Sequence, residues 1–209
     1  MTNVPGGSNY WGPNGEILKY SVSDGRLLRW NSTWAMKYDD DRSVYSPYSF
    51  ISGHARLIGT THDASGGYDL NVTVPEDLTG GVVAAFPGDK IIGASLGDTQ
   101  TRIWGLSLER GREGTLLFDR TWNSPWSTGN QTMSWSASSP EVGTLWSREL
   151  RQNYGVSFET GDLLWGPTHS QDYRDQFYPT GTLIAYGHLY TAGVGGTLYA
   201  YNLTTGETS

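Results

Sequence analysis

Acidic residues form the densest sets of chemically capable side chains in this sequence. Asp39, Asp40 and Asp41 form a triplet beside an arginine, and Asp63 and Asp69 flank a glycine-rich turn with further oxygen donors. Oxygen donors around glycines are ligands that Ca²⁺ accepts, but the distal bidentate glutamate of a calcium loop is missing. We interpret both runs as solvated turns, with calcium or a basic partner as the alternative.

The histidines provide no metal-binding or nucleophilic pattern. None of them lies in an HExxH motif or another ligand spacing. Asp172 and Asp175 form a carboxylate pair in a polar loop, which is a pairing that can support acid–base catalysis. No motif accompanies this pair, so the sequence predicts no catalytic or metal-binding residue and favours a non-enzymatic role. The four histidines are His54, His62, His169 and His188.

Aromatic residues outside the regular patterns could bind sugars. Tyr10, Trp11, Trp126 and Trp135 lie in stretches that read as loops or strand edges. An amphipathic ring can stack on the apolar face of a pyranose, but it can equally pack in a core. Both interpretations are open for these four residues.

Composition excludes several function classes. The chain has 28 glycines, 9 tryptophans and 13 tyrosines, which is typical of strands and turns. Its 14 basic residues are scattered and the net charge is −7, so nucleic acid is not an expected partner. No apolar run approaches the ~20 residues that span a bilayer, so no membrane insertion is expected. The absence of cysteine excludes disulfides and thiolate metal sites in this segment.

Four segments share an alternation of apolar residues followed by a turn glycine. A period of two predicts a β-strand with one buried face, and glycine can adopt the positive φ that tight turns often need. The copies are Leu18, Tyr20, Val22 with Gly25; Trp104, Leu106, Leu108 with Gly111; Tyr154, Val156, Phe158 with Gly161; and Tyr199, Tyr201, Leu203 with Gly206.

The turn glycines define the length of this repeat. Gly161 and Gly206 are 45 residues apart, and Gly111 precedes Gly161 by 50. Gly25 precedes Gly111 by 86, which leaves room for one more copy, and Gly66 is its predicted turn glycine. A period near 45 residues with several short strands is typical of a β-propeller blade.

The sequence therefore predicts an all-β fold, a β-propeller of four-stranded antiparallel blades. Propellers close with about four to eight blades, so four to five blades are expected to be one segment of a longer polypeptide with seven or eight blades. The predicted blades are 1–30, 31–70, 71–122, 123–165 and 166–209.

Several strings resemble a known repeat. GHLY at 187–190, GTLYAY at 196–201 and YGVSFETGDLLW at 154–165 resemble the PQQ-like, or quinoprotein alcohol dehydrogenase-like, β-propeller repeat. The resemblance covers residues 145–209 well, the first copy moderately and the middle poorly. In that repeat a closing tryptophan docks onto the neighbouring blade. The resemblance implies this role for Trp30, Leu70, Phe118, Trp122 and Trp165, with Phe118 and Trp122 as alternatives in one copy.

Four N-x-[ST] triplets raise the question of location. Such acceptors are glycosylated in secreted proteins, although Ser- and Thr-rich strands also produce them by chance. Together with the composition they predict an extracellular or cell-surface protein. The acceptors are Asn31, Asn71, Asn130 and Asn202.

The favoured function is a non-catalytic surface scaffold that binds proteins or glycans and packs against the remaining propeller blades. The resemblance leaves a PQQ-dependent dehydrogenase as one alternative, with its quinone and Ca²⁺ held mostly outside this segment. Its ring of adjacent cysteines cannot form here because the chain has no cysteine. A carbohydrate-binding or carbohydrate-active module is the other alternative. No cofactor is predicted within these residues.

Overall fold

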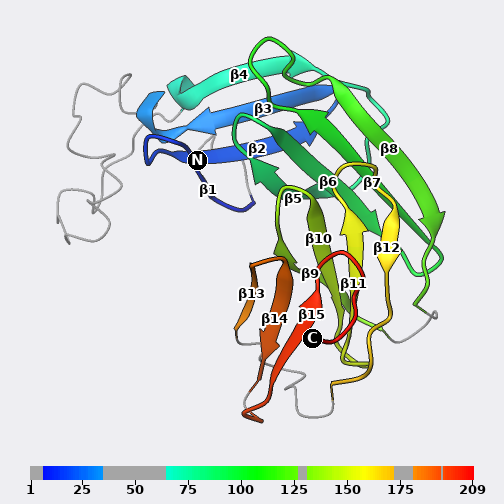
Figure 1. Cartoon of the computed structure of the whole chain (residues 1–209). Coiled ribbons are helices and arrows are strands. Elements are labelled where there is room, and N and C mark those ends of the chain that lie inside the picture. Colours follow the sequence, from blue (N-terminus) through cyan, green and yellow to red (C-terminus); the bar gives the residue numbers. More distant parts are fainter. Residues whose placement is uncertain (1–6, 35–64, 127–130, 172–180, 194) are drawn as a thin grey trace, which may run out of the picture. The chain divides into compact units, whose positions relative to one another are not determined.

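The computed structural model describes residues 7–34, 65–126, 131–171, 181–193 and 195–209. These residues form an all-β structure of four antiparallel sheets (Figure 1). The prediction of an all-β fold built from consecutive antiparallel sheets is confirmed. No helix within these ranges has the length and apolarity to cross a membrane.

Each sheet is built from strands that follow one another along the chain. The first sheet contains β1 (Tyr10–Trp11), β2 (Ile17–Ser23), β3 (Arg26–Asn31) and β4 (Tyr68–Thr73). The second contains β5 (Gly81–Phe86), β6 (Lys90–Leu96), β7 (Gln100–Ser107) and β8 (Leu116–Asn123). The third contains β9 (Met133–Ser138), β10 (Val142–Ser147), β11 (Gln152–Ser157) and β12 (Leu163–Trp165). The fourth contains β13 (Thr182–Ala185), β14 (His188–Ala192) and β15 (Leu198–Asn202).

The chain divides into two compact units. One comprises residues 1–91 and 106–116, and the other comprises residues 92–105 and 117–209. The first unit contains the first sheet, and the second unit contains the third and fourth sheets. Strands of the second sheet contribute to both units.

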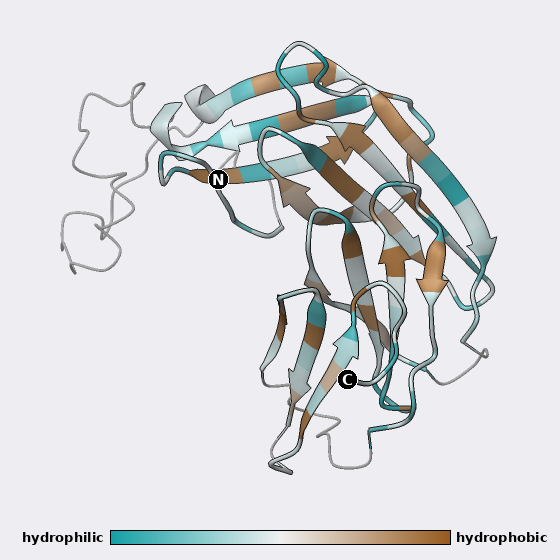
Figure 2. Cartoon of the chain, in the orientation of Figure 1, coloured by the Kyte–Doolittle hydropathy of each residue, from teal (hydrophilic) through white to brown (hydrophobic). Residues whose placement is uncertain are grey.

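Alternating burial follows the strand pattern of the sequence. Leu18 and Tyr20 on β2 are buried, whereas the intervening Lys19 is half-buried. Figure 2 shows hydrophobic residues along the strands and hydrophilic residues in many of the turns. Asp24 and Gly25, with φ of 51° and 67°, form a two-residue turn between β2 and β3. Two positive φ values are the geometry of the hairpin turns that match strand twist.

One hydrogen bond recurs in all four sheets. A backbone N–H just after one strand donates to a carbonyl in an earlier turn of the same sheet, at 2.7–2.9 Å. This bond makes β4, β7, β11 and β15 equivalent positions in the repeat. The donor–acceptor pairs are Val74–Gly25, Leu108–Asp89, Phe158–Glu141 and Leu203–Gly187.

This equivalence changes the predicted repeat. Gly25 lies in the turn before β3, whereas Gly161 lies in the turn after β11. The two glycines are therefore not in equivalent turns, although both have a positive φ. Gly66 lies in a short 3₁₀ helix, Ser65–Gly67, instead of a tight turn between paired strands. The sequence predicts that Gly25 and Gly161 are equivalent because apolar residues precede both glycines at the same spacing.

The predicted blade at 31–70 is not a separate sheet in the part of the chain that the structure describes. β4 pairs directly with β3, so the residues on both sides of positions 35–64 belong to one sheet. Asp39, Asp40, Asp41, His54 and His62 lie outside the described residues, as does Asp63.

A second turn recurs in three sheets. The N–H groups of Gly114, Gly161 and Gly206 donate to the carbonyls of Ser107, Ser157 and Asn202 at 2.8–3.0 Å. The side-chain oxygens of Ser107, Ser157 and Asn202 also accept backbone N–H groups of the same turn. Gly114 is thus the equivalent of Gly161, and Gly111 belongs to the loop before it.

Aromatic side chains connect consecutive sheets at this turn. Trp165, at the end of the third sheet, packs on Gly206 of the fourth and donates from Nε1 to the Leu203 carbonyl at 2.8 Å. Phe118 of the second sheet packs on Gly161 of the third in the same way. Trp122 donates from Nε1 to the Gly161 carbonyl at 3.0 Å. Both Phe118 and Trp122 therefore contact the neighbouring sheet.

Trp30 and Leu70 are placed differently from the docking role that the resemblance implies. Trp30 lies on β3, and its indole packs on Gly67 at the start of β4, within its own sheet. Leu70 lies on β4, paired with Arg29 and half-buried. At β4 and the residue after it, the side chains of Val72 and Val74 contact Gly114, the turn glycine of the second sheet.

The contact between Trp165 and Gly206 can be tested by substitution. Gly206 has φ +74°, and an added Cβ would lie 2.6 Å from the Trp165 ring. We expect Gly206→Ala to lower the free energy of unfolding by about 1–2 kcal/mol for the left-handed backbone and by roughly 1–3 kcal/mol more for the ring contact. Chemical denaturation measures the loss.

Gly196→Ala is the matched control for this prediction. Gly196 has φ +76°, but an added Cβ there would meet no atom within 4 Å. It should show the backbone cost alone. Equal losses for the two variants would contradict a role for the ring contact in joining the sheets.

Candidate functional site

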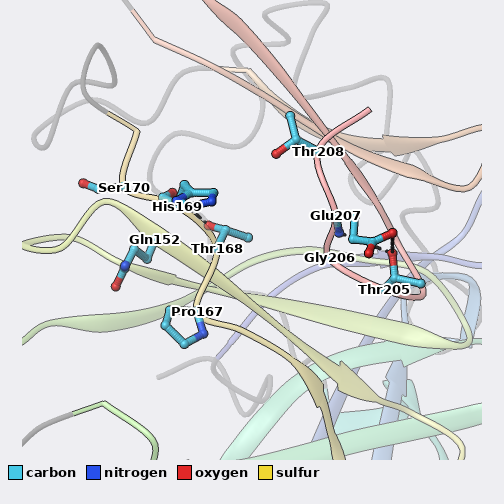
Figure 3. Close-up of a pocket in the computed structure, with 9 residues that line it drawn as sticks. All are labelled: Gln152, Pro167, Thr168, His169, Ser170, Thr205, Gly206, Glu207 and Thr208. Atoms are coloured by element: carbon cyan, nitrogen blue, oxygen red, sulfur yellow. Dashed lines mark hydrogen bonds between the residues drawn. The ribbon is translucent and has the colours of Figure 1, made fainter.

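A pocket of about 550 Å³ lies in the second compact unit (Figure 3). One wall is formed by Gln152 and the segment after β12, and the other by the turn after β15. The lining residues are Gln152, Pro167, Thr168, His169, Ser170, Thr205, Gly206, Glu207 and Thr208.

The first wall is fixed by hydrogen bonds to the start of β11. The backbone N–H of Asn153 donates to Thr168 Oγ1, and the N–H of Thr168 donates to the Asn153 carbonyl, both at 3.0 Å. Ser170 Oγ donates to the Leu150 carbonyl at 2.8 Å. These contacts extend the edge of the third sheet and hold His169 at the surface of the pocket.

The second wall is the turn whose glycine packs on Trp165. Asn202 Oδ1 accepts the N–H groups of Thr204 and Thr205 at 2.9 and 3.1 Å, which shapes the turn. Thr205 Oγ1 donates to Glu207 Oε2 at 3.4 Å, and the Glu207 carboxylate is exposed. In Figure 3, His169 and Glu207 lie on opposite walls.

The lining chemistry suits a polar ligand. The lining residues carry hydroxyl groups, one amide, one imidazole and one carboxylate, which are groups that can donate or accept hydrogen bonds. His169 and Glu207 come from different walls and have no hydrogen bond to each other in Figure 3. The described residues contain no group of three His, Asp or Glu side chains that could hold a metal ion.

The first compact unit contains a partly buried charge network. Arg29 Nε and Nη2 donate to the Asp69 carboxylate at 2.8 and 3.1 Å, and Asn31 Nδ2 donates to the same carboxylate at 2.9 Å. Burial lowers the pKa of Arg29, but the hydrogen bond and charge of Asp69 outweigh it and raise the pKa above its ordinary value. Burial also raises the pKa of the nearby Tyr20 phenol.

This network accounts for one of the predicted oxygen donors. Asp69 was expected to be a turn carboxylate with calcium as the alternative, but its two oxygens accept hydrogen bonds from Arg29 and Asn31. A pocket of about 450 Å³ lies beside Arg29 and Asn31, with Glu16, Arg110 and Glu113 also in its lining. Its acidic and basic side chains are mixed, so it presents no surface of a single charge.

Two aromatic residues considered for sugar binding lie inside the packing. Trp126 is 3% exposed, donates from Nε1 to the Gly97 carbonyl at 3.1 Å, and meets the Tyr154 ring edge-to-face. Trp135 packs on Phe158, with ring centroids 5.7 Å apart. Tyr10 packs on Tyr20. Trp11 alone of these four candidates has a largely exposed ring, at 66%.

The remaining histidine and carboxylate candidates do not line this pocket. His188 Nδ1 lies 2.8 Å from the Tyr186 carbonyl, away from the pocket that contains His169. Asp172 and Asp175 lie outside the described residues. No sequence pattern points to Glu207 or Thr205, because they line a pocket only where the turn around Gly206 faces the segment after β12.

The acceptor asparagines differ in accessibility. Asn31 is 8% exposed, with its amide nitrogen on Asp69 and its oxygen accepting the Thr33 N–H. Asn71 is exposed on β4, and its side-chain oxygen accepts a hydrogen bond from Arg26 Nε. Asn202 uses its oxygen to shape a turn. Asn130 lies outside the described residues.

Two solved structures are similar to this chain. No protein-family model matches the sequence, and no curated protein matches it. BamB from Moraxella catarrhalis is similar at 16% identity and a TM-score of 0.42, over 96% of this chain and 47% of BamB. The computationally designed protein Ika8 is similar at 13% identity and a TM-score of 0.45, over 96% of this chain and 46% of Ika8. The chain spans about half the length of each of these structures.

Accessibility predicts which acceptor can carry a glycan. In a eukaryotic secretory host we expect Asn71 to be modified and Asn31 to be unmodified in the folded product, because a glycan on Asn31 would displace its amide from Asp69. Peptide mass mapping after enzymatic deglycosylation measures occupancy at each site. Asn71→Gln should remove that glycan, whereas a folded, secreted protein with full occupancy at Asn31 would contradict the buried placement.

Proposed function

We propose that this chain is a segment of a β-propeller that acts as a non-catalytic scaffold for protein partners. The proposal includes an extracellular or cell-surface location and contacts with remaining blades. The observation that carries it is the use of the large aromatic side chains to join one sheet to the next, while apolar residues remain exposed on strands and turns.

Three indole groups support this reading. Trp122, Trp126 and Trp165 each donate from Nε1 to a backbone carbonyl, of Gly161, Gly97 and Leu203 respectively. A buried indole with its N–H satisfied contributes its area to packing and leaves no polar group for a ligand. These tryptophans therefore act as structural connections.

The exposed apolar residues supply the binding surface in this proposal. Tyr186 is 95% exposed in the turn between β13 and β14, and Leu198 is 65% exposed on β15. Exposed tyrosine side chains are common anchors of protein interfaces, and exposed apolar side chains can add contact area around them. A propeller can present such surfaces on a rigid support.

A small polar ligand, such as a glycan, is the second candidate. The pocket beside His169 and Glu207 favours it because its walls are rich in hydroxyl groups. The quinone alternative places its cofactor mostly outside this segment, and no contact among the described residues favours it over the other two.

Substitution of the two inner tryptophans separates packing from sugar binding. We expect Trp126→Ala and Trp135→Ala to lower the free energy of unfolding by roughly 3–5 kcal/mol at the more buried Trp126 and by less at Trp135. Trp11→Ala is the control, since its ring is 66% exposed, and it should change stability little. Thermal unfolding and a glycan array measure the two properties. Selective loss of glycan binding without loss of stability would contradict the scaffold reading.

Site-specific photo-crosslinking tests partner binding itself. A photoreactive phenylalanine analogue at Tyr186 should form discrete adducts with surface proteins of the chain's own cells, and the same analogue at the buried Phe158 should not. A titration with PQQ and CaCl₂, followed by tryptophan fluorescence, should show no saturable change. Saturable quenching reversed by EDTA, without protein adducts, would replace the scaffold proposal by the quinone alternative.

A further inference from the structure

The pocket between the segment after β12 and the turn after β15 has an acidic lining, and we call it the Glu207 pocket. Glu207 is the one carboxylate among its lining residues, which include no lysine or arginine. The pocket beside Arg29 differs, because two glutamates and two arginines line it and their charges cancel. A cation is therefore favoured in the Glu207 pocket, and the net charge of −7 on the chain adds to this attraction.

The Glu207 carboxylate is available to such a cation. Its side chain is exposed and forms no ion pair with another described residue. The Oε2 atom accepts one long hydrogen bond, from Thr205 Oγ1 at 3.4 Å, which leaves Oε1 for a ligand. A guanidinium binds both oxygens of a carboxylate at once, whereas an ammonium is a compact charge that needs one. The carboxylate thus suits an ammonium better than a guanidinium.

The remaining lining residues favour a primary ammonium. Such a group has three N–H donors, and the side chains of Gln152 and Thr208 carry acceptor oxygens. Quaternary ammonium groups are instead bound by cages of aromatic rings, and the lining includes no Phe, Tyr or Trp. A neutral sugar would find hydroxyl partners here but no flat ring on which to stack.

The size of the Glu207 pocket fits a lysine side chain. Its volume of about 550 Å³ lies within the range of ~300–1,000 Å³ that ligand pockets occupy. Pro167 contributes an apolar ring to one wall. The methylene stem of a lysine can lie along such apolar surface while its ammonium group stays with polar partners.

The Glu207 pocket lies at the same end of the fourth sheet as Tyr186. The N–H of Leu203 donates to the Gly187 carbonyl at 2.9 Å, and the N–H of Asn202 donates to the Glu207 carbonyl at 2.8 Å. These bonds make the β13–β14 turn and the turn after β15 neighbours. Tyr186, which is 95% exposed, lies in the first of these turns. A protein that contacts Tyr186 can therefore reach the pocket.

We propose that the Glu207 pocket binds the ammonium group of a lysine side chain on the protein partner that contacts Tyr186. Glu207 supplies the opposite charge, and Gln152 and Thr208 supply further acceptors. The inference rests on the proposed scaffold function, which it extends by naming the chemistry of the partner surface.

Ligand-observed NMR with Nα-acetyl-lysine N-methylamide tests the pocket directly. The probe should bind the full chain saturably, and acetylation of its side-chain amine should abolish this binding. Glu207→Gln should weaken binding at least about 10-fold, because a neutral hydrogen bond replaces a charge-assisted one. Glu76→Gln, at an exposed glutamate of the first compact unit, is the control and should bind the probe as the wild type does.

Three results with the probe would overturn the inference. They are no saturable binding, equal binding of the acetylated probe, and equal weakening in the two variants. Tighter binding of glucosamine than of the lysine probe would also overturn it, because the pocket would then belong to an amino sugar. Thermal unfolding of both variants shows that a change in binding does not arise from loss of the fold.

Photo-crosslinking from Tyr186 separates this inference from the scaffold function. Glu207→Gln should lower the yield of adducts formed by the analogue at Tyr186. Adducts at the wild-type yield in Glu207→Gln would contradict the lysine contact and leave the scaffold function standing. A wild-type chain that binds the probe but forms no adduct would contradict the scaffold function and, with it, a protein as the source of the lysine.

Discussion

The packing of an aromatic ring on a turn glycine is the contact on which the sheet-to-sheet structure depends. Trp165 reaches Gly206, and Phe118 reaches Gly161, each from the strand that precedes the next sheet. Any side chain at these glycines would occupy the space of the ring. Because the same turn is also shaped by the side chain of Ser157 or Asn202, the ring meets a surface whose backbone is already fixed. Packing between sheets thus depends on turn geometry within each sheet.

Much of the fold could be predicted from local pattern. The alternation of Tyr154, Val156 and Phe158 before Gly161 corresponds to β11 and its turn, because a period of two and a positive-φ glycine are both readable in sequence. The equivalence of hairpins was less readable. Gly25 and Gly161 follow similar apolar triplets, yet they lie in different turns of their sheets. The long-range bond from Val74 to Gly25 identifies the turn to which Gly25 belongs, and no local pattern encodes that bond.

The candidate site was harder to predict than the fold. His169 and Glu207 line the same pocket because the segments after β12 and β15, which are distant in sequence, lie on its two sides. The partnership of Arg29 with Asp69 has the same origin, since β3 and β4 are joined across more than thirty intervening positions. Trp126 reads as a loop residue in sequence, but its indole N–H finds the Gly97 carbonyl and its ring is buried. Such placements depend on tertiary contacts, which residue type and spacing do not determine.

The recurrent bond from strand end to turn also bears on how the chain folds. In the third sheet it closes a loop between Glu141 and Phe158, whereas in the first it closes one between Gly25 and Val74. The longer closure carries an extra entropic cost of about 1 kcal/mol for a flexible chain. Contacts between distant residues form late when local ones are available. The third and fourth sheets are therefore suited to form early, and the first sheet is expected to form after them.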